Sequence, residues 1–288
     1  MDNFYNDIKK YGTVILGSYL EVKPKPVDID SSIDYGLYWI NSVSYFDKIP
    51  PKSTVIMSTE TFNILLNDGL VNNDNTIISC DSPRKTYSNV LNDLYSHLFL
   101  DADLILLNNS NLIGYNVLMG DNVVMGINVK IGNNVVIYNN TIIGDNVNIG
   151  DNVVIGSKGV AYDEESDGTL TKFPQIGGTI LGDDIEIGNF CDIKRGALKD
   201  TVISNGVKLG AYNSVGHNVY IGENCFISAR CTICGSAKIG KNSVLWVNST
   251  IKHKITVPNR TTIGSNTYVD KSFVGDGLLL IGIPAKIK

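Results

Sequence analysis

Residues 203–238 read ISNGVK LGAYNS VGHNVY IGENCF ISARCT ICGSAK, six blocks of six that each begin with a large apolar residue. The same spacing runs without a break over twelve blocks, from Ile203 to Val269. An earlier run extends from Ile113 to Ile155, and a short one covers residues 181–193. Chance clustering does not hold one phase over twelve periods, so the chain contains a true internal repeat.

A period of six matches neither an α-helix nor a long alternating strand. It fits a triangular prism in which each block forms one short strand and three blocks close a coil of 18 residues. The large apolar residue then points inward, and the glycine that usually follows it is expected to turn the corner. Successive coils stack at about 4.8 Å, the spacing of neighbouring strands. The sequence therefore predicts a parallel β-helix, interrupted by a loop of about twenty residues after Ser157 and by a four-residue slip at GALK, residues 196–199.

The first hundred residues lack this period. Apolar strands are expected at 13–19, 53–58 and 76–80, with helices at 59–70 and 83–98, which is typical of a small α/β domain. We expect an α/β domain over 1–102, the β-helix over 103–272 and a C-terminal tail over 273–288.

Composition excludes several classes of protein. The net charge of −5 argues against nucleic acid or an anionic membrane as the main partner. No run of 18 apolar residues predicts a membrane span. The charged N-terminus lacks the apolar segment of a signal peptide, and the five cysteines are an odd number, so we expect a cytoplasmic protein with reduced thiols. The isolated pair Cys231 and Cys234 is interpreted as core thiols, and no metal site is expected.

Of the three histidines, His97 lies in a helix-like segment and is expected to be structural. His217 and His253 each follow an inward-facing residue by two positions and are 36 residues apart, which is two whole coils. Both should therefore project from one face of the prism, about 10 Å apart, with Gly235 between them. This arrangement is equally compatible with a catalytic cleft and with a solvated polar face.

Residues 173–252 resemble the UDP-3-O-acylglucosamine N-acyltransferase family of lipid A synthesis. The matching strings are FPQIGGTILGDDIEIG, IKRGALKDTVISNGVKL, VGHNVYIGENCFISA and CGSAKIG, with GSKGVAY upstream and GIPAK at the end. YWINSVSYF, residues 38–46, resembles a family segment that grips uracil. The resemblance implies a left-handed β-helix and an active site at subunit boundaries of a homotrimer.

Under this resemblance, His217 corresponds to the catalytic base, and Gly235 to the residue whose backbone N–H faces the thioester oxyanion. His253 is a secondary site, since the family's histidine stands one residue later. Tyr38 and Asn41 fall on the aromatic–Asn part of the nucleotide grip, whereas Tyr45 is displaced by one residue. An imidazole suits deprotonation of an amine, and a fixed backbone donor suits an oxyanion.

Departures from the family pattern shift the expected substrate. Lys194 stands where the family has an acid, Gly210 and Ala211 replace Asp-Asn, and the family's helical extension for acyl carrier protein has no counterpart before Lys288. We therefore expect N-acylation of a nucleotide-linked amino sugar by an acyl-CoA, such as acetyl-CoA, with no tightly bound cofactor.

Three alternatives remain open from sequence alone. The first is acyl-carrier-protein-dependent transfer by a UDP-3-O-acylglucosamine N-acyltransferase of the lipid A type. The second is a zinc protein similar to γ-type carbonic anhydrase, which is disfavoured because Pro258 stands where a third histidine is needed. The third is a non-catalytic scaffold or binding module.

Overall fold

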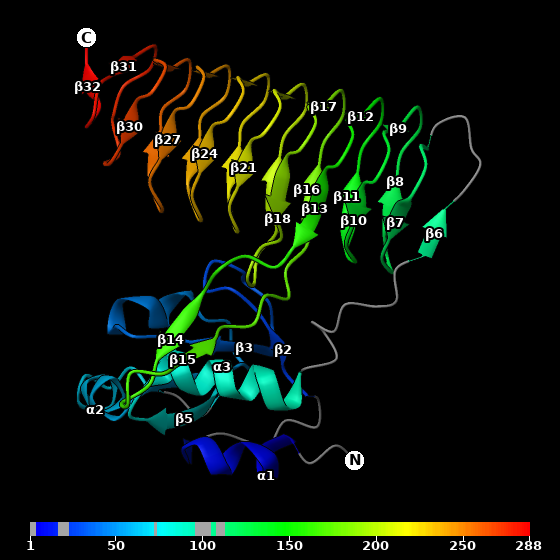
Figure 1. The fold of residues 1–288 in the computed structure, drawn as a ribbon. Coiled ribbons are helices and arrows are strands. Elements are labelled where there is room, and N and C mark those ends of the chain that lie inside the picture. The colour runs from blue at the N-terminus through cyan, green and yellow to red at the C-terminus, as the bar shows by residue number, and fades with distance from the viewer. Residues whose placement is uncertain (1–3, 17–22, 72–73, 96–104, 108–112) are drawn as a thin grey trace. The chain divides into compact units, whose positions relative to one another are not determined.

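The structure is a computed structural model that describes residues 4–16, 23–71, 74–95, 105–107 and 113–288 (Figure 1). Two compact units are present. The first contains residues 1–100 together with 161–174, and the second contains residues 101–160 and 175–288. The insertion 161–174 thus belongs to the N-terminal unit, although the sequence had placed it within the β-helix domain. His97 lies outside the described residues.

The N-terminal unit is built on a five-stranded sheet with the order β1-β5-β4-β3-β2. Its strands are β1 (Thr13–Leu16), β2 (Lys25–Pro26), β3 (Gly36–Trp39), β4 (Thr54–Ser58) and β5 (Thr76–Cys80); only β1 pairs antiparallel. Its helices are α1 (Phe4–Ile8), α2 (Thr59–Asn67) and α3 (Pro83–Leu94), with short 3₁₀ turns η1 (Lys9–Tyr11) and η2 (Val43–Lys48). All residues of β5 are buried, as expected for a parallel sheet covered on both faces. The predicted α/β fold of this region is confirmed.

The second unit is a parallel β-helix, as the six-residue period predicted (Figure 1). The first of its three sheets contains β6 (Ile105–Leu107), β7 (Val117–Met119), β10 (Val136–Ile137), β13 (Val154–Ser157), β18 (Asp192–Lys194), β21 (Ser214–Val215), β24 (Thr232–Ile233), β27 (Thr250–Ile251) and β30 (Tyr268–Val269). The second contains β8 (Val124–Met125), β11 (Thr141–Ile143), β16 (Thr179–Leu181), β19 (Thr201–Ile203), β22 (Tyr220–Ile221), β25 (Lys238–Ile239) and β28 (Thr256–Val257).

The third sheet contains β9 (Lys130–Ile131), β12 (Asn148–Ile149), β17 (Glu186–Ile187), β20 (Lys208–Leu209), β23 (Phe226–Ile227), β26 (Val244–Leu245), β29 (Thr262–Ile263), β31 (Leu279–Ile281) and β32 (Lys286–Ile287). Strands β31 and β32 lie within residues 273–288, so this segment continues the sheet. The pairing β31–β32 is antiparallel, whereas β29–β31 is parallel.

The inward-facing residues of the repeat form one continuous core. Ile203, Val215 and Ile233 are each no more than 1% exposed, and Val215 lies in register with Ile233 one coil later. Burying a side chain of this size contributes about 1.5–3 kcal/mol. The repeat therefore supplies the main stabilising term for the second unit.

The corners differ from the sequence expectation. The residue with left-handed φ stands two positions after the glycine and is usually an asparagine, such as Asn218 with φ of 59°. The glycine is required for another reason: a Cβ on Gly188 would lie 2.6 Å from the backbone N of Ala211 in the next coil. Glycine at this position lets two coils approach, while the asparagine turns the chain.

The insertion 161–174 folds as a hairpin of β14 (Tyr162–Glu164) and β15 (Leu170–Lys172). Its Asp163 pairs with Arg84 and its Glu165 with Lys85, both on α3. Arg84 also lies 4.9 Å from the centre of the Phe173 ring. The expected irregular loop is therefore an ordered element of the N-terminal unit.

Candidate active site

His217 lies in the turn between β21 and β22, on the edge where the first and second sheets meet. Gly235 follows β24, and His253 follows β27, at the same place in the next two coils. We call residues 216–218, 234–236 and 252–254 the histidine edge. The two histidines thus project from an edge of the prism, whereas the sequence had placed them on a flat face.

The imidazole of His217 lies directly over the α-carbon of Gly235. A Cβ built on Gly235 would be 2.6 Å from His217 Nε2 and 2.9 Å from both Cδ2 and Cε1. These separations are well inside van der Waals contact. Only glycine at position 235 leaves room for the ring in this orientation, so the two residues proposed for catalysis are in direct contact.

The ring is held from its other nitrogen by Asn218. His217 Nδ1 lies 2.9 Å from Asn218 Oδ1. The same oxygen accepts a hydrogen bond from the Ala197 N–H at 3.0 Å, and Asn218 Nδ2 donates to the Lys199 carbonyl at 3.2 Å. These two contacts fix which end of the amide is oxygen. Because that oxygen can only accept, Nδ1 is the donor, and in the neutral imidazole the lone pair therefore lies on Nε2.

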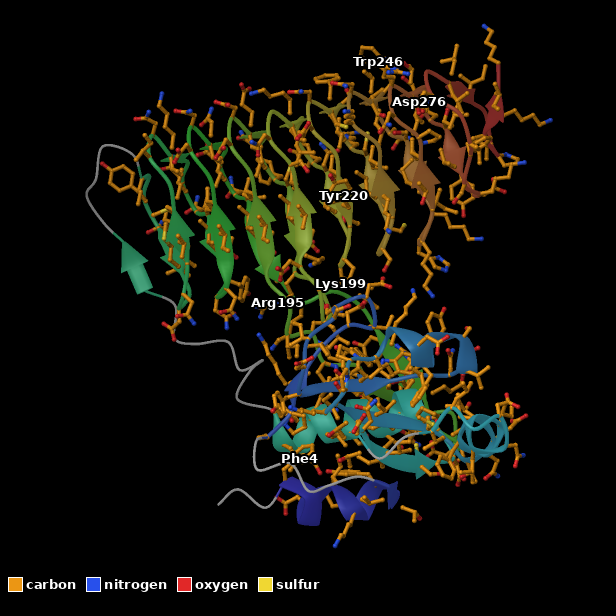
Figure 2. All side chains as sticks on the ribbon, turned by 180° about the vertical axis from the view of Figure 1, so that it is seen from behind. Phe4, Arg195, Lys199, Tyr220, Trp246 and Asp276 are labelled. Atoms are coloured by element: carbon orange, nitrogen blue, oxygen red, sulfur yellow. The ribbon has the colours of Figure 1, made fainter. Side chains whose placement is uncertain are left out.

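The four-residue slip at 196–199 is what positions Asn218. A Cβ on Gly196 would lie 1.5 Å from the Lys199 carbonyl oxygen, so the loop turns tightly on itself. Just before it, Arg195 is fully buried and donates from Nε to the Gly177 carbonyl and from Nη2 to the Asn139 carbonyl, both at 2.8 Å (Figure 2). The interruption of the repeat therefore holds Asn218, and through it the ring of His217, in place.

The backbone N–H of Gly235 is open. On the other two edges, the equivalent N–H is often capped by an Asp or Asn of the next coil, as in Ile127 N–H to Asp145 Oδ1 at 2.8 Å and Asp151 N–H to Asn189 Oδ1 at 2.9 Å. The residue of the next coil beyond Gly235 is His253, which supplies no such cap. Within the part of the chain that the structure describes, the Gly235 N–H has no acceptor.

The backbone side of His217 lies next to Gly159 and Gln175, which stand just before and just after the 161–174 insertion and form what we call its neck. A Cβ on Gly159 would lie 3.2 Å from His217 Cβ and 3.2 Å from both amide atoms of Gln175. Gln175 Oε1 accepts a hydrogen bond from the Gly159 N–H. The chain thus leaves and re-enters the prism beside His217.

His253 and Lys194 are placed differently from the base. His253 is exposed, and no hydrogen bond or ion pair of its side chain occurs among the described residues. Lys194 Nζ pairs with Asp192 Oδ2 at 2.7 Å and donates to Ser157 Oγ at 3.0 Å. The unusual lysine is therefore neutralised by an acid two residues before it on the same strand.

In the N-terminal unit, the expected role of Tyr38 is corrected. Tyr38 is 0% exposed, and its hydroxyl donates to the Ser31 carbonyl at 2.5 Å and accepts from the Ile33 N–H at 3.1 Å. Burial in the core raises the pKa of this phenol. Its ring cannot stack on a nucleotide base. Asn41 and Tyr45 are both exposed, just beyond the carboxyl end of β3.

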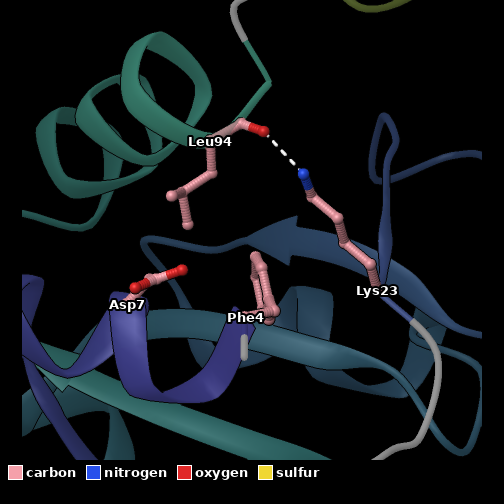
Figure 3. Close-up of a pocket in the computed structure, with 4 residues that line it drawn as sticks. All are labelled: Phe4, Asp7, Lys23 and Leu94. Atoms are coloured by element: carbon pink, nitrogen blue, oxygen red, sulfur yellow. Dashed lines mark hydrogen bonds between the residues drawn. The ribbon is translucent and has the colours of Figure 1, made fainter. Parts of the chain in front are cut away.

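A shallow pocket in the same unit is lined by Phe4, Asp7, Lys23 and Leu94 (Figure 3). Lys23 Nζ donates to the Leu94 carbonyl at 2.6 Å within it. None of the residues expected from sequence lines this pocket.

Among the described residues, no group of three or more His, Cys, Asp or Glu side chains could hold a metal ion. Cys231 is buried and Cys234 half-buried, and both are free thiols. No helix within the described ranges is long and apolar enough to cross a membrane.

Sequence reasoning singled out His217 and Gly235 as candidate site residues but assigned no role to the residues that contact them. Asn218 stood in the quoted GHNV string without a role, and the slip was treated only as a change of phase. Gly159 and Gln175 were part of the matching strings. The two interruptions of the repeat could have indicated these residues, because the 161–174 insertion and the slip at 196–199 both place residues next to the histidine edge.

Comparisons with known proteins agree with the fold and its repeat. The model of the bacterial transferase hexapeptide (six repeats) matches residues 122–157 and 200–235. A UDP-3-O-acylglucosamine N-acyltransferase of Coxiella burnetii is 51% identical over 63 residues, 22% of this chain and 18% of that protein. The corresponding enzyme of Psychromonas ingrahamii is 54% identical over 54 residues, 19% of this chain and 16% of that protein. The match thus spans less than a fifth of these relatives.

A UDP-N-acetylglucosamine acyltransferase from Campylobacter jejuni has a similar fold, with a TM-score of 0.54 and 20% sequence identity, covering 61% of this chain and 66% of that chain. At this identity the likeness concerns the fold alone. The chain therefore contains hexapeptide repeats that match the bacterial transferase model, and it has partial homology to the UDP-3-O-acylglucosamine N-acyltransferases.

Proposed function

We propose that this chain is an N-acyltransferase that moves an acyl group, acetyl from acetyl-CoA, to the amino group of a nucleotide-linked sugar. The observation that carries the proposal is the state of His217. Asn218 holds the Nδ1 proton, so the neutral imidazole has its lone pair on Nε2, beside Gly235, whose N–H has no acceptor among the described residues.

The chemistry follows from these groups. The sugar amine attacks the thioester carbonyl, forming the C–N bond while its proton passes to His217 Nε2. The carbonyl oxygen becomes an oxyanion, which the Gly235 N–H stabilises because that donor is fixed before the reaction. Collapse of the intermediate breaks the C–S bond, and the imidazolium returns its proton to the leaving thiolate. The products are an amide and a free thiol, and the imidazole ends as it began.

The nucleotide is assigned to Asn41 and Tyr45. Both follow β3, and the carboxyl ends of parallel strands are the common place for nucleotide ligands. The Asn41 amide can both donate to and accept from a pyrimidine edge, and the exposed Tyr45 ring can stack on it. Tyr38 serves to hold the loop that precedes β3.

Assembly as a homotrimer in the cytoplasm is part of the proposal. Each flat sheet of a prism offers a surface for a second copy. The third sheet carries Phe226 and Trp246, which are 41% and 46% exposed and pack edge to face at 5.8 Å. Two large aromatic side chains left open on a flat sheet favour contact with another protein surface.

Transfer from acyl carrier protein, which the resemblance to the enzymes of lipid A synthesis implies, is the second candidate. The family-like strings on both sides of His217 support it, whereas Lys194 and Ala211 in place of the family's acid and asparagine favour a different acceptor.

The test is release of free thiol from acetyl-CoA across a panel of UDP- and dTDP-linked amino sugars, with the matching hydroxyl sugars as controls. We expect turnover with at least one amino sugar and none with its hydroxyl counterpart. Turnover only with an acyl carrier protein donor would replace the proposal by the second candidate. Binding of a nucleotide sugar without turnover from either donor would indicate a binding module.

A further inference from the structure

Gln175 stands where the chain re-enters the prism after the 161–174 insertion. Its side chain is 1% exposed, and Oε1 accepts from the Gly159 N–H. Its Nε2 is buried and has no hydrogen-bond partner within the described part of the chain. The carboxamide oxygen therefore links the two ends of the insertion through the Gly159 N–H, whereas the carboxamide nitrogen makes no hydrogen bond among the described residues.

The unused donor lies beside the proposed base. A Cβ on Gly159 would be 3.2 Å from Gln175 Nε2 and 3.2 Å from His217 Cβ, so the amide and the root of the imidazole both border the space that a side chain at position 159 would fill. Gly235 lies at the opposite end of the ring, against Nε2 of His217. The carboxamide and the Gly235 N–H thus flank the imidazole from its two ends.

An unpaired buried amide is costly for folding. Buried polar groups nearly always have a partner, and exceptions call for a specific explanation such as a bound ligand. The link between Gly159 and residue 175 needs only an acceptor for the Gly159 N–H, and a carboxylate or a hydroxyl would supply that acceptor. The Nε2 end contributes nothing to the fold, so its partner is expected to arrive with a ligand.

We propose that Gln175 Nε2 donates a hydrogen bond to an uncharged oxygen of the acceptor sugar, next to the amine that His217 deprotonates. This inference rests on the proposed function. The thioester carbonyl is assigned to Gly235, which leaves the Gln175 end of the ring for the acceptor. Because Nε2 is buried, a hydrogen bond to it is shielded from bulk water, and a site of that kind discriminates strongly between acceptors with and without the oxygen.

The test uses the full chain with Gln175→Met, which keeps the length of the side chain but removes the Nε2 donor together with the Oε1 that accepts from the Gly159 N–H. We expect acceptor binding, measured by calorimetry without donor, to weaken about 10-fold, as for the loss of one hydrogen bond. The KM for acetyl-CoA should stay unchanged. Thr267→Val is the matched control, because Thr267 Oγ1 is also buried without a partner but belongs to a later coil. It should change neither value.

Acceptor analogues that each lack one hydroxyl identify the bonded oxygen. Wild type should lose about 10-fold in affinity for one analogue, while Gln175→Met should bind that analogue and the full acceptor equally. Equal acceptor affinity of wild type and Gln175→Met, with turnover intact, overturns the inference and leaves the proposed function standing. Failure of wild type to bind or acylate any amino sugar overturns both.

Discussion

Gly235→Ala tests whether the contact between Gly235 and the His217 ring matters for catalysis. The added Cβ would lie 2.6 Å from His217 Nε2, whereas an ordinary contact is about 3.5 Å. The ring must therefore retreat by about 1 Å, and a misplacement of that size can reduce a rate by about 10²-fold, or about 2.7 kcal/mol in the barrier. We expect kcat to fall by that factor.

The backbone itself accepts alanine at this place in the turn. Ala211 and Ala229 occupy the equivalent corner position on another edge of the prism, so the substitution should leave the fold and the Gly235 N–H in place. The assay is thiol release at saturating donor and acceptor, with thermal unfolding as the control for folding.

A double-mutant cycle separates this steric effect from others. Once His217→Ala has removed the ring, the methyl group at 235 has nothing to displace, so adding Gly235→Ala should cost almost nothing further. A Gly235→Ala enzyme with wild-type kcat would refute the reasoning. Additive losses in the double mutant would show that the alanine acts independently of the ring.

His217→Ala should lower kcat by roughly 10²- to 10⁴-fold with little change in either KM, and His253→Ala should lower kcat by less. The effect of His217→Ala on kcat should become smaller at higher pH, because the acceptor amine then loses its proton without help. A His217→Ala enzyme with near wild-type kcat at neutral pH would exclude His217 as the general base. Replacing Asn41 and Tyr45 together by alanine should raise the nucleotide-sugar KM far more than the donor KM, and an unchanged acceptor KM would dismiss that site. Sedimentation should give a trimer, and a stable monomer at assay concentration would contradict it. Burial raises the pKa of Cys191 to about 11, so the folded thiol stays protonated between pH 9 and 11 while the unfolded one ionises. This thiol should therefore lower the unfolding free energy by about 2–3 kcal/mol across that window, and urea titrations of Cys191→Ala should show a slope against pH that is smaller by that amount.

The repeat was readable because its physics is local. Each coil must bury one large apolar side chain per face, so the sequence itself shows the six-residue period at buried positions such as Val215 and Ile233. The corner assignment went wrong because sequence shows which residues recur but not which one has left-handed φ. Glycine and the asparagine two positions later recur together, and only coordinates separate close approach at Gly188 from the turn at Asn218.

The site was predictable only where it follows the period. His217 and Gly235 occupy the same position in successive coils of 18 residues, so the repeat length alone predicts that they lie next to each other. Asn218 acquires its role through Ala197 and Lys199, whose position depends on how a non-repeating loop closes. Tyr38 was misplaced for a similar reason: its ring faces the core of the N-terminal unit, and alternation along a four-residue strand is too short to tell the two faces apart.

The hairpin at 161–174 makes the two units difficult to exchange between proteins. A unit joined at a single boundary can be transferred by one recombination event, but here the N-terminal unit is completed by a segment that the prism supplies. Transfer of residues 1–100 alone would leave Arg84 and Lys85 without their acidic partners, and the recipient prism would need a matching insertion between two of its own coils. If the N-terminal unit binds a nucleotide as proposed, a change in its preference should therefore arise by point substitution within this pair of units, and hybrids with relatives should fold only when the hairpin is transferred with the N-terminal unit.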